Sequence, residues 1–315
     1  LYLGVPFIVV GMVGMASMRA TGDTRLPGKL MVIASVLNII LDPILIFGIG
    51  PIPALGLDGA ALAALIARGA IFVGTVYLLR ARLRLLVLSW PRREILFRSW
   101  RDILHVGLPA AGNNIIVPMG ATIVTAMIAS FGTEAVAGFG VASRIETMML
   151  VLYYAMSSII GPFVGQNLSA GKEARILRSL WLCTGFCIAS GLVIAVFLAA
   201  LSGVLPGLFS DDPAAIRVTR QFLWIVPISY GAYGMVMVMN AAFNGLGKPM
   251  PGVWVSLMRI LVLYIPLAML AQRFFGVAGI FAAYAIANIV TGVFAYAWAR
   301  AQVRRLFADE RAVTA

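Results

Sequence analysis

The chain has 315 residues, of which 62% are hydrophobic and only 11% are charged. Soluble domains carry about 25% charged residues, so this composition excludes an ordinary soluble globular protein. The formal charge of +12 would suit a nucleic-acid-binding protein, but the hydrophobic residues form long uninterrupted runs that such a protein does not need.

Taken in chain order, the hydrophobic runs predict an all-α polytopic membrane protein with nine transmembrane helices. Each run is long enough to cross a bilayer core of about 30 Å. The expected spans cover residues 1–18, 30–48, 56–79, 103–130, 135–161, 177–203, 215–243, 250–271 and 276–299.

Most of the 24 basic residues lie on one side of these spans. They cluster after the first, third, fifth, seventh and ninth spans, whereas the opposite connections hold only Arg217, Arg220 and Arg273. Positively charged loops face the cytoplasm, so the sequence predicts a multi-pass protein of the cytoplasmic (inner) membrane with a cytoplasmic C-terminus. The charge is thereby explained without nucleic acid, and anionic lipid headgroups are the expected partners of the cytoplasmic loops.

The first three spans resemble the last three. The segment GDTRLPGKLMVIASVLNIILDP aligns with GLGKPMPGVWVSLMRILVLYIP, and GLDGAALAALIAR aligns with GVAGIFAAYAIAN. Such repeats are usual in two-lobed transporters. Spans four to six lack an upstream partner, so we expect three further helices before residue 1 in a six-plus-six bundle. Residues 1–80 would end the first lobe, 81–102 would form a basic cytoplasmic linker, 103–300 the six-helix second lobe and 301–315 a cytoplasmic tail.

An aspartate stands inside the second span, in the segment VLNIILDPILIFG. A carboxylate at this depth costs about 2.5–3.5 kcal/mol on insertion scales, and such residues are commonly functional. Asn38 lies one helical turn before Asp42 on the same face. The repeat aligns Asp42 with Pro266, so packing that is common to both lobes does not require the acid. We expect Asp42 to bind and release a proton beside Asn38; a structural ion pair with Arg68 is the alternative.

Further ionisable residues and amides lie inside the spans. The ionisable residues inside the spans are Arg68, Arg144, Glu146 and Arg259. We expect them to be buried, either as structural partners of other helices or as functional groups. The amides suit a substrate cavity, with interhelical hydrogen bonding as the alternative: Asn113, Asn114 and Asn240. The chain has one histidine and no catalytic or metal-ligand cluster. The sequence therefore predicts neither an enzyme nor a metal or organic cofactor.

Several segments in this order resemble the MATE (multidrug and toxic compound extrusion) family, most of all its DinF-like branch: RATGDTRLPGK, LNIILDPILIFG, GLDGAALAALIA, VGLPAAGNN, ASRIE and VGQNLSAGKEAR. The resemblance covers essentially the whole chain and matches the last nine of the family's twelve helices. It implies an antiporter that exports lipophilic, often cationic drugs or metabolites by alternating access. The driving force would be inward flow of H⁺ or Na⁺, with Asn38 and Asp42 in the coupling site. Spans 103–130 and 215–243 hold no Asp or Glu, so the second-lobe cation site of Na⁺-type members is not expected.

A flippase for lipid-linked oligosaccharides, from the same superfamily, is the alternative function. Its cavity should carry several Arg or Lys residues for a pyrophosphate, and only Arg68, Arg144 and Arg259 are candidates. We therefore expect a small-molecule export substrate and a monomeric protein. The sequence leaves the substrate itself and the choice between H⁺ and Na⁺ open.

Overall fold

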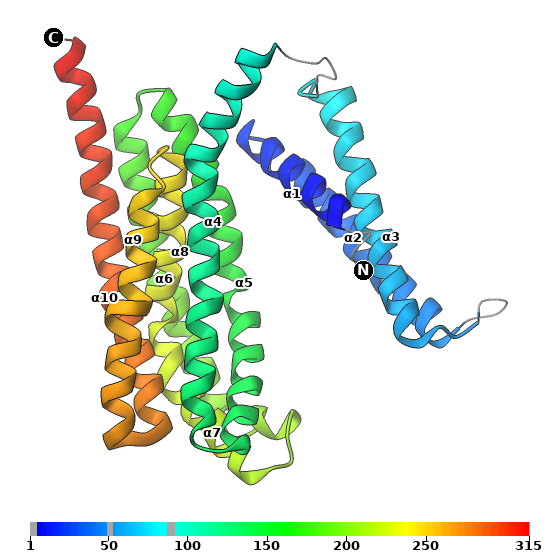
Figure 1. The fold of residues 1–315 in the computed structure, drawn as a ribbon, viewed down its shortest axis with the longest axis vertical. Coiled ribbons are helices and arrows are strands. Elements are labelled where there is room, and N and C mark those ends of the chain that lie inside the picture. The colour runs from blue at the N-terminus through cyan, green and yellow to red at the C-terminus, as the bar shows by residue number, and fades with distance from the viewer. Residues whose placement is uncertain (1–4, 49–52, 87–91, 315) are drawn as a thin grey trace. The chain divides into compact units, whose positions relative to one another are not determined.

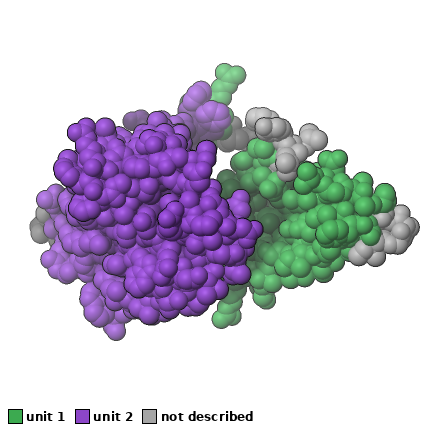
Figure 2. Space-filling view, turned by 90° about the horizontal axis from the view of Figure 1, so that it is seen from below, with its two compact units in different colours: residues 1–96 green, residues 97–315 purple. Residues whose placement is uncertain are grey.

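The computed structural model describes residues 5–48, 53–86 and 92–314. Within these ranges the chain is helical, with short turns and loops between the helices (Figure 1). The chain divides into two compact units, residues 1–96 and 97–315 (Figure 2).

The first unit contains α1 (Val5–Ala20), α2 (Arg25–Phe47) and α3 (Gly56–Tyr77), and a π-helical turn continues α3. The antiparallel helices α2 and α3 approach closely where glycines remove a side chain. A Cβ atom on Gly59 would lie 2.2 Å from the carbonyl oxygen of Leu45, and one on Gly74 would lie 2.6 Å from the Leu30 side chain. These two contacts fix the register of the α2–α3 pair.

The second unit contains α4 (Arg93–Ala129) from Phe97 onward, α5 (Thr133–Ser169), α6 (Glu173–Leu201), α7 (Pro213–Ile225), α8 (Tyr230–Gly245), α9 (Met250–Leu257) and α10 (Ile265–Thr314). A 3₁₀ turn, Val226–Ser229, joins α7 to α8, and a π-helical segment, Met258–Tyr264, joins α9 to α10. The helix α10 bends at Gly276, where φ is 58°. Irregular helical turns of this kind are frequent at functional sites.

The helix α8 is the centre of the second unit and packs against α5, α6 and α10. Its sequence, YGAYGMVMVMNAAFNG, is apolar on nearly every side, and a helix of that kind is buried. Glycines allow the close approach, because a Cβ atom on Gly191 of α6 would lie 2.4 Å from the backbone nitrogen of Gly231. This packing holds one hydrophobic core in the unit.

The all-α membrane architecture is confirmed, whereas the expected count of nine transmembrane helices is not. Among the described residues, seven helices are long and apolar enough to cross a membrane. The helix α1 has 16 residues, and the expected spans 250–271 and 276–299 lie in one helical run that bends at Gly276. The hydrophobicity of each segment showed where the apolar runs lie, but it did not show which neighbouring runs continue as one helix.

The segments expected outside the spans are partly helical. The expected linker, 81–102, is helical from Arg93 onward, and the expected tail continues α10 as far as Thr314. Val303 and Phe307 in that tail are buried in the core of the second unit. The assignment of the two ends of the chain to separate lobes joined by a linker stays a prediction.

Candidate functional site

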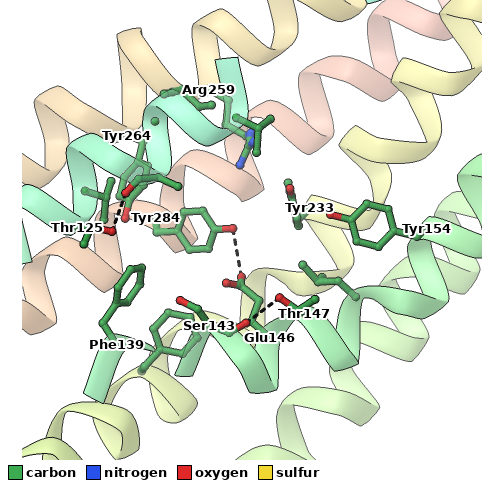
Figure 3. Close-up of a pocket in the computed structure, with 17 residues that line it drawn as sticks. Thr125, Phe139, Ser143, Glu146, Thr147, Tyr154, Tyr233, Arg259, Tyr264 and Tyr284 are labelled. Atoms are coloured by element: carbon green, nitrogen blue, oxygen red, sulfur yellow. Dashed lines mark hydrogen bonds between the residues drawn. The ribbon is translucent and has the colours of Figure 1, made fainter. Parts of the chain in front are cut away.

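The second unit contains a partly open cavity of about 360 Å³ between α4, α5, α7, α8, the π-helical segment and α10 (Figure 3). Apolar and aromatic side chains form most of its wall. Its two ionisable groups besides tyrosines are Glu146 and Arg259, and we call it the glutamate cavity. The polar side chains around it come from helices far apart in the sequence: Thr125, Ser143, Thr147, Tyr154, Tyr233, Tyr264 and Tyr284.

Arg259 reaches this cavity from the π-helical segment and is only 4% exposed. Its Nη1 donates to Oδ1 of Asn288 at 3.1 Å, and its guanidinium lies 4.6 Å from the centre of the Tyr233 ring. Its Nε has no hydrogen-bond partner in the described part of the chain. The arginine is thus held firmly by neutral groups, with one buried donor unused.

Asn288 fixes the orientation of this arginine. Its Oδ1 accepts from Arg259, while its Nδ2 donates to Ser229 Oγ at 3.1 Å. Ser229 Oγ in turn donates to the carbonyl of Val226 at 2.8 Å, inside the 3₁₀ turn between α7 and α8. Because both ends of the amide are engaged, its orientation is specified. The relay therefore ties the π-helical segment, α10 and the 3₁₀ turn to one another.

Glu146 enters the glutamate cavity from α5, and the Tyr284 hydroxyl donates to its carboxylate at 3.2 Å (Figure 3). No ion pair within 4.0 Å joins Glu146 to Arg259 in the described residues. Arg144, which the sequence grouped with these two as a buried charge, is instead exposed. It is two positions from Glu146 and therefore lies on a different side of α5.

A second cavity, of about 430 Å³, shares the residues Val117, Tyr154, Tyr233 and Arg259 with the first. We call it the amide cavity, because three asparagines line it: Asn114, Asn240 and Asn244. The structure thus places the expected cavity residues Asn114 and Asn240 around one space. The side chain of Asn113 lies outside the described part of the structure.

Asn240 is only partly satisfied in the amide cavity. Its Nδ2 donates to Ser256 Oγ at 3.2 Å, while its buried Oδ1 has no partner among the described residues. The alternative role for Asn240, interhelical hydrogen bonding, is therefore observed only for its Nδ2 donor. The acceptor end is a buried polar group that lacks a hydrogen bond within the described chain.

In the first unit, Asn38 Nδ2 donates to Asp42 Oδ1 at 3.4 Å, and both side chains are half-buried. No ion pair within 4.0 Å joins Asp42 to Arg68, the alternative partner, among the described residues. The antiparallel register of α2 and α3 puts Asp42 level with Leu62, about 9 Å along the helix axis from the level of Arg68. Arg68 instead lines a groove of about 250 Å³ together with Asn38.

Sequence reasoning missed the tyrosines and the amide that hold the two charges: Tyr233, Tyr284 and Asn288. A signal was present. Asn288 is an amide inside an apolar span, the same pattern that selected Asn240. The tyrosines lie deep within spans rather than at the membrane interface where tyrosine usually concentrates.

The comparisons with known proteins agree with this fold. The family model MatE matches residues 109–270. An FAD transporter of Shewanella oneidensis is 36% identical over 295 residues, covering 94% of this chain and 65% of the relative. The probable multidrug resistance protein YoeA of Bacillus subtilis is 24% identical over 320 residues, covering 97% and 68%. The chain thus spans 65% and 68% of the lengths of these two curated relatives.

Solved structures give the same result. The Vibrio cholerae MATE transporter VcmN in its bent form has a TM-score of 0.82 at 32% identity, covering 92% of this chain and 66% of that one. A MOP superfamily transporter from Pyrococcus furiosus has a TM-score of 0.85 at 24% identity, covering 96% and 68%, and at that identity it shows the fold alone. These relatives and neighbours are transporters rather than enzymes.

Proposed function

We propose that the whole protein is a secondary antiporter that exports small molecules, because this chain belongs to the MATE family of multi-pass membrane transporters. One observation carries the proposal: the helical bundle of the second unit contains two partly open cavities that meet at a buried arginine. Ionisable residues inside membrane helices are expensive, and they commonly mark a substrate or ion pathway. Alternating access would expose these cavities to each side of the membrane in turn.

The driving ion in this proposal is H⁺, with Na⁺ as the alternative, and Asp42 and Asn38 form the coupling site. Asp42 is half-buried, accepts one long hydrogen bond and has no cationic partner among the described residues. Such a carboxylate is free to exchange a cation. A coupling ion must bind the two states of a transporter differently, and a change of charge at a half-buried carboxyl provides that difference. We propose no metal or organic cofactor.

Two substrate classes follow from the relatives. The multidrug relatives support lipophilic, often cationic compounds. The FAD transporter, at 36% identity, supports flavin nucleotides, which carry phosphates and a planar ring system. Arg259 beside aromatic side chains is the observation that favours the second class for the described cavities.

A flippase for lipid-linked oligosaccharides is less well supported. A pyrophosphate site would gather several cations, whereas each described cavity or groove is lined by a single arginine and by no lysine. We further propose a monomer in the cytoplasmic membrane, with the C-terminus and the basic loops on the cytoplasmic side against anionic headgroups.

The test is transport by the full-length protein in proteoliposomes. An imposed pH gradient, an imposed Na⁺ gradient and no gradient would be compared for ethidium, for flavin nucleotide and for a lipid-linked sugar. We expect uphill movement of a soluble substrate under the pH gradient. Movement of the lipid-linked sugar alone would replace the antiporter with the flippase, and no movement under either gradient would refute both.

A further inference from the structure

We propose that Arg259 is the anion-binding residue of a ligand site formed by the glutamate and amide cavities together. The site takes a planar aromatic molecule that carries a phosphate or carboxylate group. This inference rests on the proposed export function and names the class of its substrate.

The charge on Arg259 is buried without a counter-charge in contact. The side chain is 4% exposed, and in the described chain no carboxylate lies within 4.0 Å of it. A buried charge is normally paired, because its removal from water is costly. Asn288 and Tyr233 orient the guanidinium, but neither carries a charge. An anionic ligand in either cavity would supply the missing counter-charge, because Arg259 lines both.

The glutamate does not fill this role. Glu146 lines only the glutamate cavity, and its carboxylate accepts from Tyr284 rather than from the arginine. The amide cavity has Arg259 as its one charged lining residue. The side of the arginine that faces the amides is therefore electrostatically positive.

The walls indicate an aromatic ligand. Tyr154 and Tyr233 line both cavities, so they stand beside the arginine at the junction. Further rings complete the glutamate cavity: Phe139, Phe222, Tyr264 and Tyr284. Aromatic rings pack well against planar ring systems, and a tyrosine adds a hydroxyl that can form a hydrogen bond.

The amide groups add recognition of a heterocycle edge. Asn114, Asn240 and Asn244 line the amide cavity together. Amides pair with the alternating donors and acceptors of a heterocyclic ring. The volumes of about 360 and 430 Å³ lie in the range of small-molecule sites.

The experiment compares two probes that differ by one phosphate, riboflavin and riboflavin 5′-phosphate (FMN). Binding to the full-length purified protein in detergent would be followed by flavin fluorescence, without any ion gradient. A charge-assisted hydrogen bond corresponds to about tenfold or more in affinity, so FMN should bind at least that much more tightly than riboflavin. Equal affinities in the wild-type protein would overturn the proposal without any variant.

Three variants test which arginine causes the preference for FMN over riboflavin. Arg259→Gln should bring FMN affinity to that of riboflavin, and Arg259→Lys should keep part of the preference because it keeps the charge. Arg144→Gln is the matched control, since Arg144 is exposed on the neighbouring helix α5. A preference that survives in Arg259→Gln, or that disappears in Arg144→Gln, would refute the assignment.

A lipid headgroup could offer the same phosphate chemistry, so phosphatidylglycerol forms a third arm. Displacement of FMN by this lipid in wild-type protein but not by phosphatidylcholine would assign the site to a lipid and overturn the aromatic class. Because binding needs no gradient, these results are independent of transport. Export of ethidium with no FMN preference would leave the antiporter standing and remove only this inference.

Discussion

Tyr284 and Asn288 lie one helical turn apart on α10, and each contacts one of the two ionisable side chains, Glu146 and Arg259, of the glutamate cavity. Tyr284 donates to Glu146 of α5, whereas Asn288 accepts from Arg259 of the π-helical segment. Residues four positions apart face the same side of a helix. A movement of α10 relative to its neighbours would therefore alter both contacts together, and ligand binding at either charge is linked to the position of one helix.

The first prediction concerns Asp42 in the full-length protein. Asp42→Asn keeps the size of the side chain and a hydrogen bond to Asn38, and in the described chain it breaks no ion pair. We expect unchanged thermal stability and a loss of pH-gradient-driven export, because a site with no change of protonation cannot shift the equilibrium between states. Asp58→Asn is the control, since Asp58 is an exposed aspartate in the first turn of α3. Wild-type export with wild-type pH dependence in Asp42→Asn would rule out the coupling role.

The second prediction tests the relay through Asn288. Asn288→Ala leaves Arg259 Nη1 without its acceptor in a fully buried place. An unsatisfied buried group costs about 1–3 kcal/mol, so the free energy of unfolding should fall by that amount. Asn114→Ala is the matched control, because this asparagine is exposed to its cavity, and surface changes usually stay within about 0.5 kcal/mol. Unfolding in detergent by heat or denaturant would measure both, and equal stabilities would show that the relay is not needed.

The third prediction concerns the charge on Glu146. Glu146→Gln replaces the carboxyl group that lines the glutamate cavity together with Arg259 by a neutral amide and keeps an acceptor for Tyr284. Loss of the carboxyl group should strengthen FMN binding and weaken ethidium binding, each by about fivefold, which corresponds to about 1 kcal/mol. Glu134→Gln, an exposed change at the start of the same helix, should alter neither affinity. Fluorescence titrations with both dyes give the readout, and a parallel change for both dyes would contradict an electrostatic effect.

The fourth prediction concerns the contact between α6 and α8. Gly191→Ala would put a methyl group 2.4 Å from the backbone nitrogen of Gly231, and backbone cannot move aside as a flexible side chain can. We expect a loss of about 1–3 kcal/mol in stability, the usual cost of overpacking. Gly185→Ala on the same helix meets nothing within 4 Å and should be neutral or slightly stabilising. Similar melting temperatures for the two variants would mean that α6 and α8 can separate without cost.

The sequence by itself determined the class of protein and the positions of its apolar runs along the chain. Hydrophobicity and charge are local properties, so the apolar runs marked the membrane helices and the ordered segments marked the family. The same local property singled out Glu146 and Arg259 as ionisable residues inside spans, and Asn114 and Asn240 as amides inside spans.

Only the tertiary structure decided which of these residues meet. Glu146 and its partner Tyr284 are 138 positions apart, and Arg144, two positions away, is exposed. The rotation of each helix about its axis follows from packing against several others, which one helix's periodicity does not contain. The π-helical segment adds to this, since it shifts the face on which Arg259 projects away from that of a regular helix. The register of α2 against α3 likewise separates Asp42 from Arg68. The close contacts at Gly59 and Gly74 set how far one helix is shifted along the other.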